Sequence, residues 1–369
     1  MKVLLFARSD LRKKPGGDGW QLGECRDFLA SKGFAAELLE RPDPRVLRTA
    51  GVLLLFNLNV VHEHLLLLSA AERLGIPVLL FPIYHSLELY HRCGRFPPYR
   101  FLSSMEIESM ERLRSLSSAC RGNRHRGSAL REVILGHRSG QVRLLEACRF
   151  VLCSSRAEGE SLRADFPGLD PGKLRVVPNF VNPERLGLIG RGRELRRRGT
   201  AVLQVGRIED LKNQLALVHA LAGTGLEARF LGRPNPFHWW YVRAFRKALE
   251  TLPGASHLSE VAAERYTETF LAARVHVQPS WVEAIGQVSL EAMALGCEVV
   301  LTKHSHAWEY LGTSARRVDP SDRAALKAAV VEAYGSWTLE GAKRRSEEVL
   351  SWGARDVALT ALLDALAEL

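Results

Sequence analysis

Short apolar runs alternate with helical patterns along most of this chain, and the alternation constrains its fold more than any other feature. The helical patterns end at glycines, as Gln21–Lys32 does before Gly33, and a glycine there is a C-cap signal. Repeated strand–helix units predict α/β architecture with doubly wound parallel sheets. The strand-like segments, four to eight residues long and mostly apolar, are Lys2–Ala7, Val52–Phe56, Ile76–Ile83, Phe150–Cys153, Leu174–Val177, Ala201–Val205, Ala228–Leu231, Val275–Gln278 and Glu298–Leu301.

The number of such units is too large for one domain. The chain has 369 residues, and roughly 100 to 200 residues per domain predicts two domains. The Arg- and Gly-rich stretch Gly187–Gly199 has the composition of a linker. We therefore expect a first domain over 1–190, a second over 191–350, and a C-terminal helix over 351–369 that packs back on the first domain.

The apolar runs are too short for a membrane span. Even Ile76–Ile83 falls far short of the roughly 18 to 20 residues that a spanning helix needs. Charged residues follow Val3–Ala7 at once, so no apolar signal core is expected. The six cysteines form no CxxC pair, which favours reduced, mostly buried thiols. These features predict a cytoplasmic protein.

The net charge of +10 is concentrated locally. His91–Arg149 contains twelve Arg against five Glu, and Glu184–Arg198 contains six Arg against two Glu. We expect residues 91–140 to form a basic flap, with an amphipathic helix at about Glu106–Cys120. Such a face fits an anionic partner, either a nucleic acid or acidic lipid headgroups, and the alternative is a solubilising surface. Attachment to the inner face of the plasma membrane would follow from the lipid interpretation.

The first motif runs from Gly206 to Asn213, directly after a predicted strand. Ligands of α/β sheets bind at the carboxyl ends of strands. Arg207 and Lys212 would place two cations beside exposed helix N–H groups, a combination suited to a diphosphate. Taken alone, the pair could equally be two solvated surface charges.

The second motif combines two carboxylates with a helix N-terminus. Glu283 lies in the loop after a predicted strand, and Gly286 permits close backbone approach at a helix start. Glu291 lies about one and a half turns into that helix. Two carboxylates eight positions apart are common by chance, but the flanking Pro279, Ser280 and Gly286 make this arrangement more specific.

With both motifs, the chain resembles the retaining glycosyltransferases of group 1, or family 4, which have the GT-B fold. Glu283 and Glu291 match the family pattern of two Glu separated by seven residues, and Gly206, Arg207 and Lys212 match its G-R-x-x-x-x-K pattern. The resemblance implies two Rossmann-like domains facing a cleft. It also implies a nucleotide-diphosphate sugar as the donor and a glycan or lipid-linked acceptor, as in the assembly of surface polysaccharide or glycolipid.

The resemblance also implies roles for individual residues. Arg207 and Lys212 would stabilise the leaving diphosphate, Glu283 would hold hydroxyls of the donor sugar, and Glu291 would accept hydrogen bonds from the ribose. The acceptor hydroxyl would attack from the face that the leaving group occupies, with no obligatory protein nucleophile. The backbone N–H groups expected to face the phosphates are those of Ile285, Gly286, Gln287 and Val288.

Two sites in the first half of the chain complete the expected set. The Gly-rich loop that contains Gly16 and Gly17 resembles the loop that faces the donor phosphates in this family. His85 occupies the place of a histidine that commonly faces the transferred sugar, with His62, His64 and His91 as competing candidates.

No metal cofactor is expected. The sequence has no Asp-x-Asp pair, and His304 and His306 have no convincing cluster of further ligands in the sequence around them. Two alternatives to the transferase remain: a GT-B nucleotide-sugar epimerase, and a nucleic-acid-binding protein that uses the Arg-rich segments. No base-stacking aromatic motif accompanies those arginines, so no nucleic acid is expected as a partner.

Overall fold

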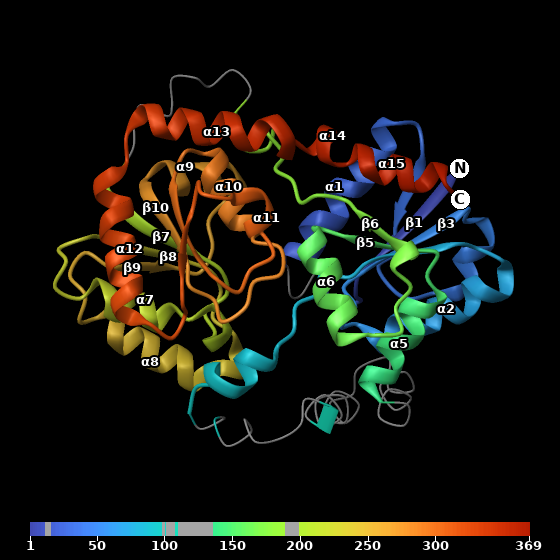
Figure 1. Cartoon of the computed structure of the whole chain (residues 1–369), viewed down its shortest axis with the longest axis horizontal. Helices are drawn as coiled ribbons and strands as arrows, with labels where there is room; N and C mark the ends of the chain where they lie inside the picture. Colours follow the sequence, from blue (N-terminus) through green and yellow to red (C-terminus); the bar gives the residue numbers. More distant parts are fainter. Residues whose placement is uncertain (12–15, 98–99, 101–107, 110–135, 189–198) are drawn as a thin grey trace. The chain divides into compact units, whose positions relative to one another are not determined.

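The computed structural model describes residues 1–11, 16–97, 100, 108–109, 136–188 and 199–369, and these form two compact units (Figure 1). Unit 1 contains the described parts of 1–86, 105–179 and 355–369. Unit 2 contains the described parts of 87–104 and 180–354. Apart from residues 108–109, the predicted helix at 106–120 lies outside the described residues, as do residues 189–198 of the predicted linker Gly187–Gly199.

Unit 1 is a parallel six-stranded sheet in the order β2-β1-β3-β4-β5-β6. Its central strands are fully buried because their apolar side chains are covered on both faces of the sheet. The strands are β1 (Lys2–Phe6), β2 (Ala35–Leu38), β3 (Val52–Phe56), β4 (Val78–Phe81), β5 (Phe150–Cys153) and β6 (Leu174–Val176). The helices are α1 (Gly17–Ser31), η1 (Pro44–Thr49), α2 (Val61–Leu74), α5 (His137–Ala147), α6 (Arg156–Asp165), η4 (Pro171–Lys173), α14 (Arg355–Ala358) and α15 (Thr360–Ala367).

Unit 2 repeats this architecture with a parallel sheet in the order β12-β11-β10-β7-β8-β9. Its strands are β7 (Ala201–Val205), β8 (Ala228–Leu231), β9 (Ser256–Leu258), β10 (Ala273–Gln278), β11 (Glu298–Thr302) and β12 (Arg316–Val318). Its helices are η2 (Tyr90–Gly94), η6 (Asp210–Lys212), α7 (Gln214–Leu221), η7 (Pro236–His238), α8 (Trp239–Leu249), α9 (Ala263–Leu271), α10 (Gln287–Ala294), α11 (Trp308–Leu311), α12 (Arg323–Ser336) and α13 (Leu339–Gly353).

Two hydrophobic clusters cover the two faces of the second sheet. Side chains of α9, α10, α11 and α13 pack on one face, and those of α7, α8 and α12 pack on the other (Figure 1). The predicted fold class is therefore confirmed: each half of the chain is a doubly wound α/β sheet. Within the described ranges, every helix is too short or too polar to span a lipid bilayer.

The structure divides the chain before the position that composition suggested. Phe180 and Val181 are fully buried, and Val181 belongs to the core of unit 2. The Val181 N–H donates to the Gly353 carbonyl over 2.7 Å, so the second unit begins and ends at adjacent backbone segments. Arg355 then lies 3.4 Å from Glu24 of α1, in unit 1.

Candidate functional site

The candidate site of unit 2 lies at the carboxyl ends of β7 and β10. These strands are parallel neighbours in the sheet, so the loops that follow them emerge at the same edge. The loop after β7 carries Arg207 and Lys212, and the loop after β10 carries Glu283. The two sequence motifs are therefore adjacent in space.

Lys212 and Glu283 form the central ion pair. The Lys212 Nζ lies 2.7 Å from Glu283 Oε2, and the two side chains are 20% and 15% exposed. Gln278 Nε2 and Ser280 Oγ donate to the same oxygen over 3.2 Å each. Burial raises the pKa of Glu283, but the Lys212 charge and these hydrogen bonds outweigh burial and hold that pKa below its usual value. Glu283 is therefore an ionised carboxylate that solvent still reaches.

Asn213 fixes the Lys212 loop against its neighbours. Its backbone is left-handed, with φ of 56°, and its Nδ2 donates to the carbonyls of Pro279 and Pro320 over 3.1 and 2.9 Å. Asn tolerates this conformation better than most residues because its short side chain can hydrogen-bond locally. Gln204 Nε2 donates to the Lys212 carbonyl over 2.7 Å. Three strand ends are thereby tied together around the cation.

Gly286 has the conformation and the crowding that require glycine. Its φ is +64°, and an added Cβ would lie 2.9 Å from the Ala307 Cβ. Gly286 is the N-cap of α10, and its carbonyl accepts from Ser289 N and Leu290 N. Ile285 is buried, whereas Gln287 and Val288 in the first turn are half-buried.

Glu291 is buried and held by two side chains. Tyr266 Oη donates to its Oε2 over 2.6 Å, and Gln287 Nε2 donates to its Oε1 over 3.2 Å and to the Phe180 carbonyl over 3.0 Å. Only 4% of Glu291 is exposed. Burial, together with the Glu291 charge, raises the pKa of Tyr266 well above its usual value, so the phenol remains a donor. The sequence analysis did not identify Tyr266, which lies 25 residues before Glu291.

Arg207 is the more exposed of the two cations. Its side chain is 53% exposed, and its guanidinium lies 3.7 Å from the buried Glu209. Asn235 Nδ2 donates to the other Glu209 oxygen over 2.6 Å. Gln214 Nε2 donates a hydrogen bond to the Arg207 carbonyl over 2.8 Å. The backbone under Arg207 is thus fixed while its side chain reaches into solvent.

Asp210 is a second functional anchor that sequence reasoning missed. Its carboxylate accepts from Tyr90 Oη and His238 Nδ1 over 2.7 Å each, and from the Phe96 N–H over 3.0 Å. Burial raises the pKa of Asp210, but the hydrogen bond and charge of His238 and the Tyr90 hydrogen bond hold it below its usual value. Asp210 therefore ties the start of the segment expected to be a flap to the Lys212 loop.

In unit 1, His85 follows a strained turn after β4. Ile83 has φ of 46°, which is unfavourable for a β-branched residue. Glu158 of α6, 1% exposed, accepts from the Tyr84 N–H over 2.6 Å and from Ser154 N and Oγ over 2.6 and 2.7 Å. His85 is half-buried, and its Nδ1 lies 3.0 Å from the Ser86 carbonyl.

The three competing histidines, His62, His64 and His91, each contact other protein groups. His64 is fully buried, its Nε2 lies 2.9 Å from the Ala7 carbonyl, and burial lowers its pKa to about 4. His62 lies 3.9 Å from Glu63. His91 belongs to unit 2, where it is buried and its Nδ1 lies 2.7 Å from Arg95. The role expected of His85 stays a prediction.

Gly16 and Gly17 lie at the start of α1, where Gly16 is the N-cap. Asp18 is buried in the first turn and forms an ion pair with Arg8. The Arg8 Nε lies 2.7 Å from the Asp18 Oδ2. Lys14 and Pro15 of the same loop lie outside the described residues. Across the described part of the chain, no three His, Cys, Asp or Glu side chains form a group that could hold a metal ion.

Comparison with solved structures defines the class of fold. The chain is similar over its whole length to sucrose-phosphate synthase from Thermosynechococcus elongatus, with 16% identity, a TM-score of 0.70 and 99% of that chain covered. It is similar to Anabaena HepE in complex with UDP, with 14% identity, a TM-score of 0.69 and complete coverage of both chains. It is also similar to WaaG, with 13% identity, a TM-score of 0.63 and coverage of 99% and 98%. The fold is that of GT-B glycosyltransferases.

The sequence comparisons agree with this fold over the second half of the chain. Residues 199–336 match the sequence model described as "Glycosyl transferases group 1", which confirms the predicted family resemblance. The chain is 29% identical over 239 residues to D-inositol 3-phosphate glycosyltransferase from Geodermatophilus obscurus. That alignment covers 59% of this chain, and the chain spans about half the length of this relative, 53%.

Proposed function

We propose that this protein is a retaining glycosyltransferase that transfers a sugar from a nucleotide-diphosphate sugar to a glycan or lipid-linked acceptor without a metal ion. The family match over unit 2 and the whole-chain fold support a transferase. The single observation that carries the proposal is the Lys212–Glu283 pair at the carboxyl edge of the sheet. It joins the two motifs whose spacing first indicated the family.

The cations supply the counter-charge for the leaving group. An ammonium has three N–H donors, and Glu283 accepts from only one of them. The others can point to a bound diphosphate, while the exposed Arg207 guanidinium offers a planar fork to a second oxygen. Cations fixed before the reaction stabilise negative charge as it develops, which is the work that a metal ion performs in other transferases.

The two carboxylates would contact different parts of the donor. Glu283, ionised and partly exposed, would accept hydrogen bonds from hydroxyls of the donor sugar and stabilise the positive charge that develops on the sugar ring. Glu291, held by Tyr266 and Gln287, would accept from the ribose beside the first turn of α10. The N–H groups of Ile285–Val288 would then face the phosphates.

His85 is proposed to face the transferred sugar, and the loop with Gly16 and Gly17 to face the donor phosphates. The strained Ile83 supports the first assignment, because strain persists where surrounding contacts enforce it and it clusters at functional sites. UDP and UDP-glucose in the solved HepE complexes support a nucleotide-sugar donor for this chain, and they make uridine nucleotides the first to test.

A binding panel followed by product analysis tests the proposal. Nucleotide diphosphates and nucleotide sugars should raise the apparent melting temperature, since ligands that bind only the folded state stabilise it. With an active donor and acceptor, NMR should show that the product keeps the anomeric configuration of the donor, and EDTA should leave turnover unchanged. Inversion would exclude the retaining mechanism, rescue of EDTA-treated protein by manganese would exclude metal independence, and epimerised free donor would favour the epimerase.

A further inference from the structure

An aromatic cluster is exposed where α8 begins. Phe237, Trp239 and Trp240 are 52%, 47% and 39% exposed, and no other Phe or Trp in the described ranges is as exposed. The Trp239 and Trp240 rings stack with centroids 3.7 Å apart. Exposing three neighbouring large aromatic side chains to water is unfavourable, so such a cluster marks an interaction surface.

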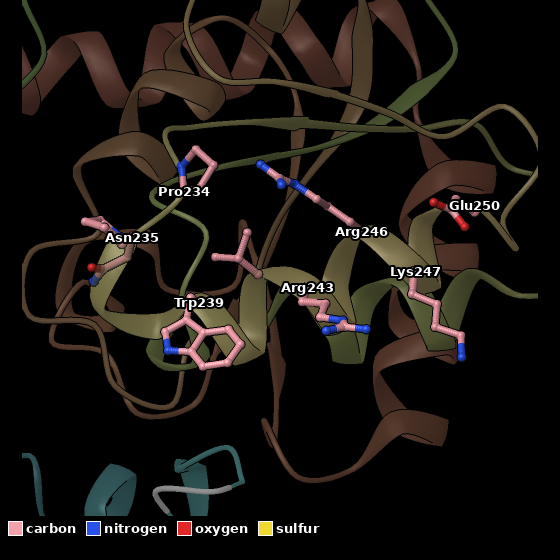
Figure 2. A pocket seen from close by; sticks show the side chains of 9 residues that line it. Pro234, Asn235, Trp239, Arg243, Arg246, Lys247 and Glu250 are labelled. Carbon is pink, nitrogen blue, oxygen red and sulfur yellow. The ribbon is translucent and has the colours of Figure 1, made fainter.

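The same helix carries a row of cations on its outer side. Tyr241, Val242 and Phe245 are buried in the core of unit 2 and fix the inner side of α8. Arg243, Arg246 and Lys247 are exposed. Residues at i, i+4 and i+8 lie close to one face of a helix, so Trp239, Arg243 and Lys247 follow one line. Figure 2 shows these three side chains projecting toward the same side of α8.

A hollow of about 640 Å³ adjoins this row, between α8 and the loop Pro234–Pro236. Arg246 extends across it toward Pro234 (Figure 2). Glu250 is the only acidic residue among those that line the hollow. Trp239 and the three cations line the hollow, and Trp240 stacks on Trp239. We call these residues and the neighbouring Phe237 the α8 face: Phe237, Trp239, Trp240, Arg243, Arg246 and Lys247.

We propose that the α8 face binds the surface of an anionic lipid bilayer. Tryptophan favours the membrane interface, where its apolar ring and polar N–H are both accommodated, and Arg and Lys beside it can reach lipid phosphates. The cations would repel those of a second copy, which argues against self-association. Trp239 and Trp240 stack on each other, which covers one face of each ring and argues against a platform for stacked bases.

This surface differs from the one that composition indicated. Charge composition predicts membrane contact in His91–Arg149, most of which lies outside the described residues. The α8 face belongs to unit 2 and combines aromatic rings with charge. Lipid binding through it therefore has one component that salt screens and one that salt does not. Its test reads lipid binding alone, so its failure would leave the proposed transferase untouched.

Vesicle sedimentation of the full chain tests the proposal. The protein should bind vesicles of equal parts phosphatidylcholine and phosphatidylglycerol at low salt and bind pure phosphatidylcholine weakly. Trp239→Ala with Trp240→Ala should lower the partition coefficient about tenfold. Arg243→Gln with Lys247→Gln should lower it about fivefold for each cation removed and flatten the salt dependence. Unchanged unfolding midpoints would show that the variants fold.

Matched changes elsewhere provide the controls. Lys343→Gln with Arg344→Gln removes the same charge from exposed positions of α13, and Val331→Ala removes an exposed apolar side chain from α12. Both should bind vesicles nearly as wild type does. Equal losses in the α13 and α8 charge variants, or wild-type binding by the double Trp variant, would overturn the proposal. So would a self-association or single-strand nucleic-acid affinity that the Trp changes abolish while vesicle binding persists.

Discussion

Glu158 in unit 1 and Glu283 in unit 2 are both carboxylates placed where a strand gives way to a helix, yet their surroundings differ. Glu158 is 1% exposed, and its carboxylate accepts from neutral donors of Tyr84 and Ser154. Burial outweighs those hydrogen bonds and raises its pKa. Glu283 has a cationic partner, Lys212, stays 15% exposed, and has a lowered pKa.

The difference separates a structural carboxylate from a chemical one. Ser155 Oγ accepts from the Glu158 N–H at the start of α6, so Glu158 joins a helix cap to the backbone of the His85 loop. Its carboxylate is almost fully buried by the protein. Glu283 keeps solvent access and a fixed charge, which are the properties that a developing positive charge on a sugar ring requires. Position in a strand–helix unit is therefore a weaker guide to function than exposure and the charge of the partner.

The largest expected effect is on catalysis at Glu283. Glu283→Gln keeps the size of the side chain but removes its charge, so kcat should fall by about 10² or more, while affinity for the free nucleotide diphosphate changes little. The assay pairs turnover with calorimetric nucleotide binding, and Glu260→Gln, an exposed surface change in the same unit, serves as the control. Full activity of Glu283→Gln would show that the charge of Glu283 has no role in the chemical step.

Glu158 should affect stability instead. Glu158→Ala leaves the Tyr84 and Ser154 N–H groups without their buried acceptor, so the free energy of unfolding should fall by about 2 to 3 kcal/mol. Urea unfolding measures it, with the exposed Glu160→Ala of the same helix as the control. Nucleotide affinity should change little, because Lys212, Glu283 and Glu291 lie in unit 2 and the loop with Gly16 and Gly17 leads into α1 and not α6. If Glu158→Ala matched its control in stability, the structural interpretation of Glu158 would fail.

Glu291 lies between these two cases, because it is as buried as a structural residue yet is proposed to touch the donor. Glu291→Gln should weaken binding of both nucleotide sugar and free nucleotide by about 1 to 3 kcal/mol. Tyr266→Phe, which removes one hydrogen bond to Glu291, should weaken both by about 1 kcal/mol. Calorimetry with UDP and UDP-glucose measures the losses, with Glu264→Gln at an exposed position of α9 as the control. Equal nucleotide losses in Glu283→Gln and Glu291→Gln would contradict the assigned roles.

The central strands and the site loops could be predicted because their signals are local. Val52–Phe56 is a continuous apolar segment, Ala201–Val205 is apolar except for Gln204, and both are buried central strands. The strands that the sequence missed, β2, β9 and β12, lie at sheet edges and contain three or four residues each. None of them contains a long apolar run, and pairing with the neighbouring strand defines them.

The partners of the site residues could not be predicted because they depend on long-range contacts. The Tyr90 hydroxyl reaches Asp210 across 120 positions of sequence, and Tyr266 reaches Glu291 across 25. Neither pair has a spacing that a helix or strand repeats. Motif spacing therefore indicated Lys212 and Glu283. The side chains that hold the neighbouring loops in place could be identified only from the three-dimensional structure.

The smallest expected effect, and the most direct test of the comparison, is the sign of a pH dependence. The folded pKa of Glu283 lies below the usual 4.5, so between that folded value and 4.5 the unfolded chain binds more protons, and stability rises with pH. The folded pKa of Glu158 lies above 4.5, so in the window from 4.5 up to that folded value the native state binds more protons, and stability falls as pH rises.

Urea midpoints of wild type, Glu283→Gln and Glu158→Gln, measured at closely spaced pH values on both sides of 4.5, resolve the two signs. Replacing Glu283 should remove a contribution that is present above pH 4.5 and lost as the pH falls through the folded pKa. Replacing Glu158 should remove a contribution that is present below pH 4.5 and lost as the pH rises through the folded pKa. The difference curves should therefore slope in opposite directions. If both curves had the sign expected for Glu158, burial and not the charge of the partner would govern both carboxylates, and Glu283 would lose the electrostatic property that distinguishes it as the chemical residue.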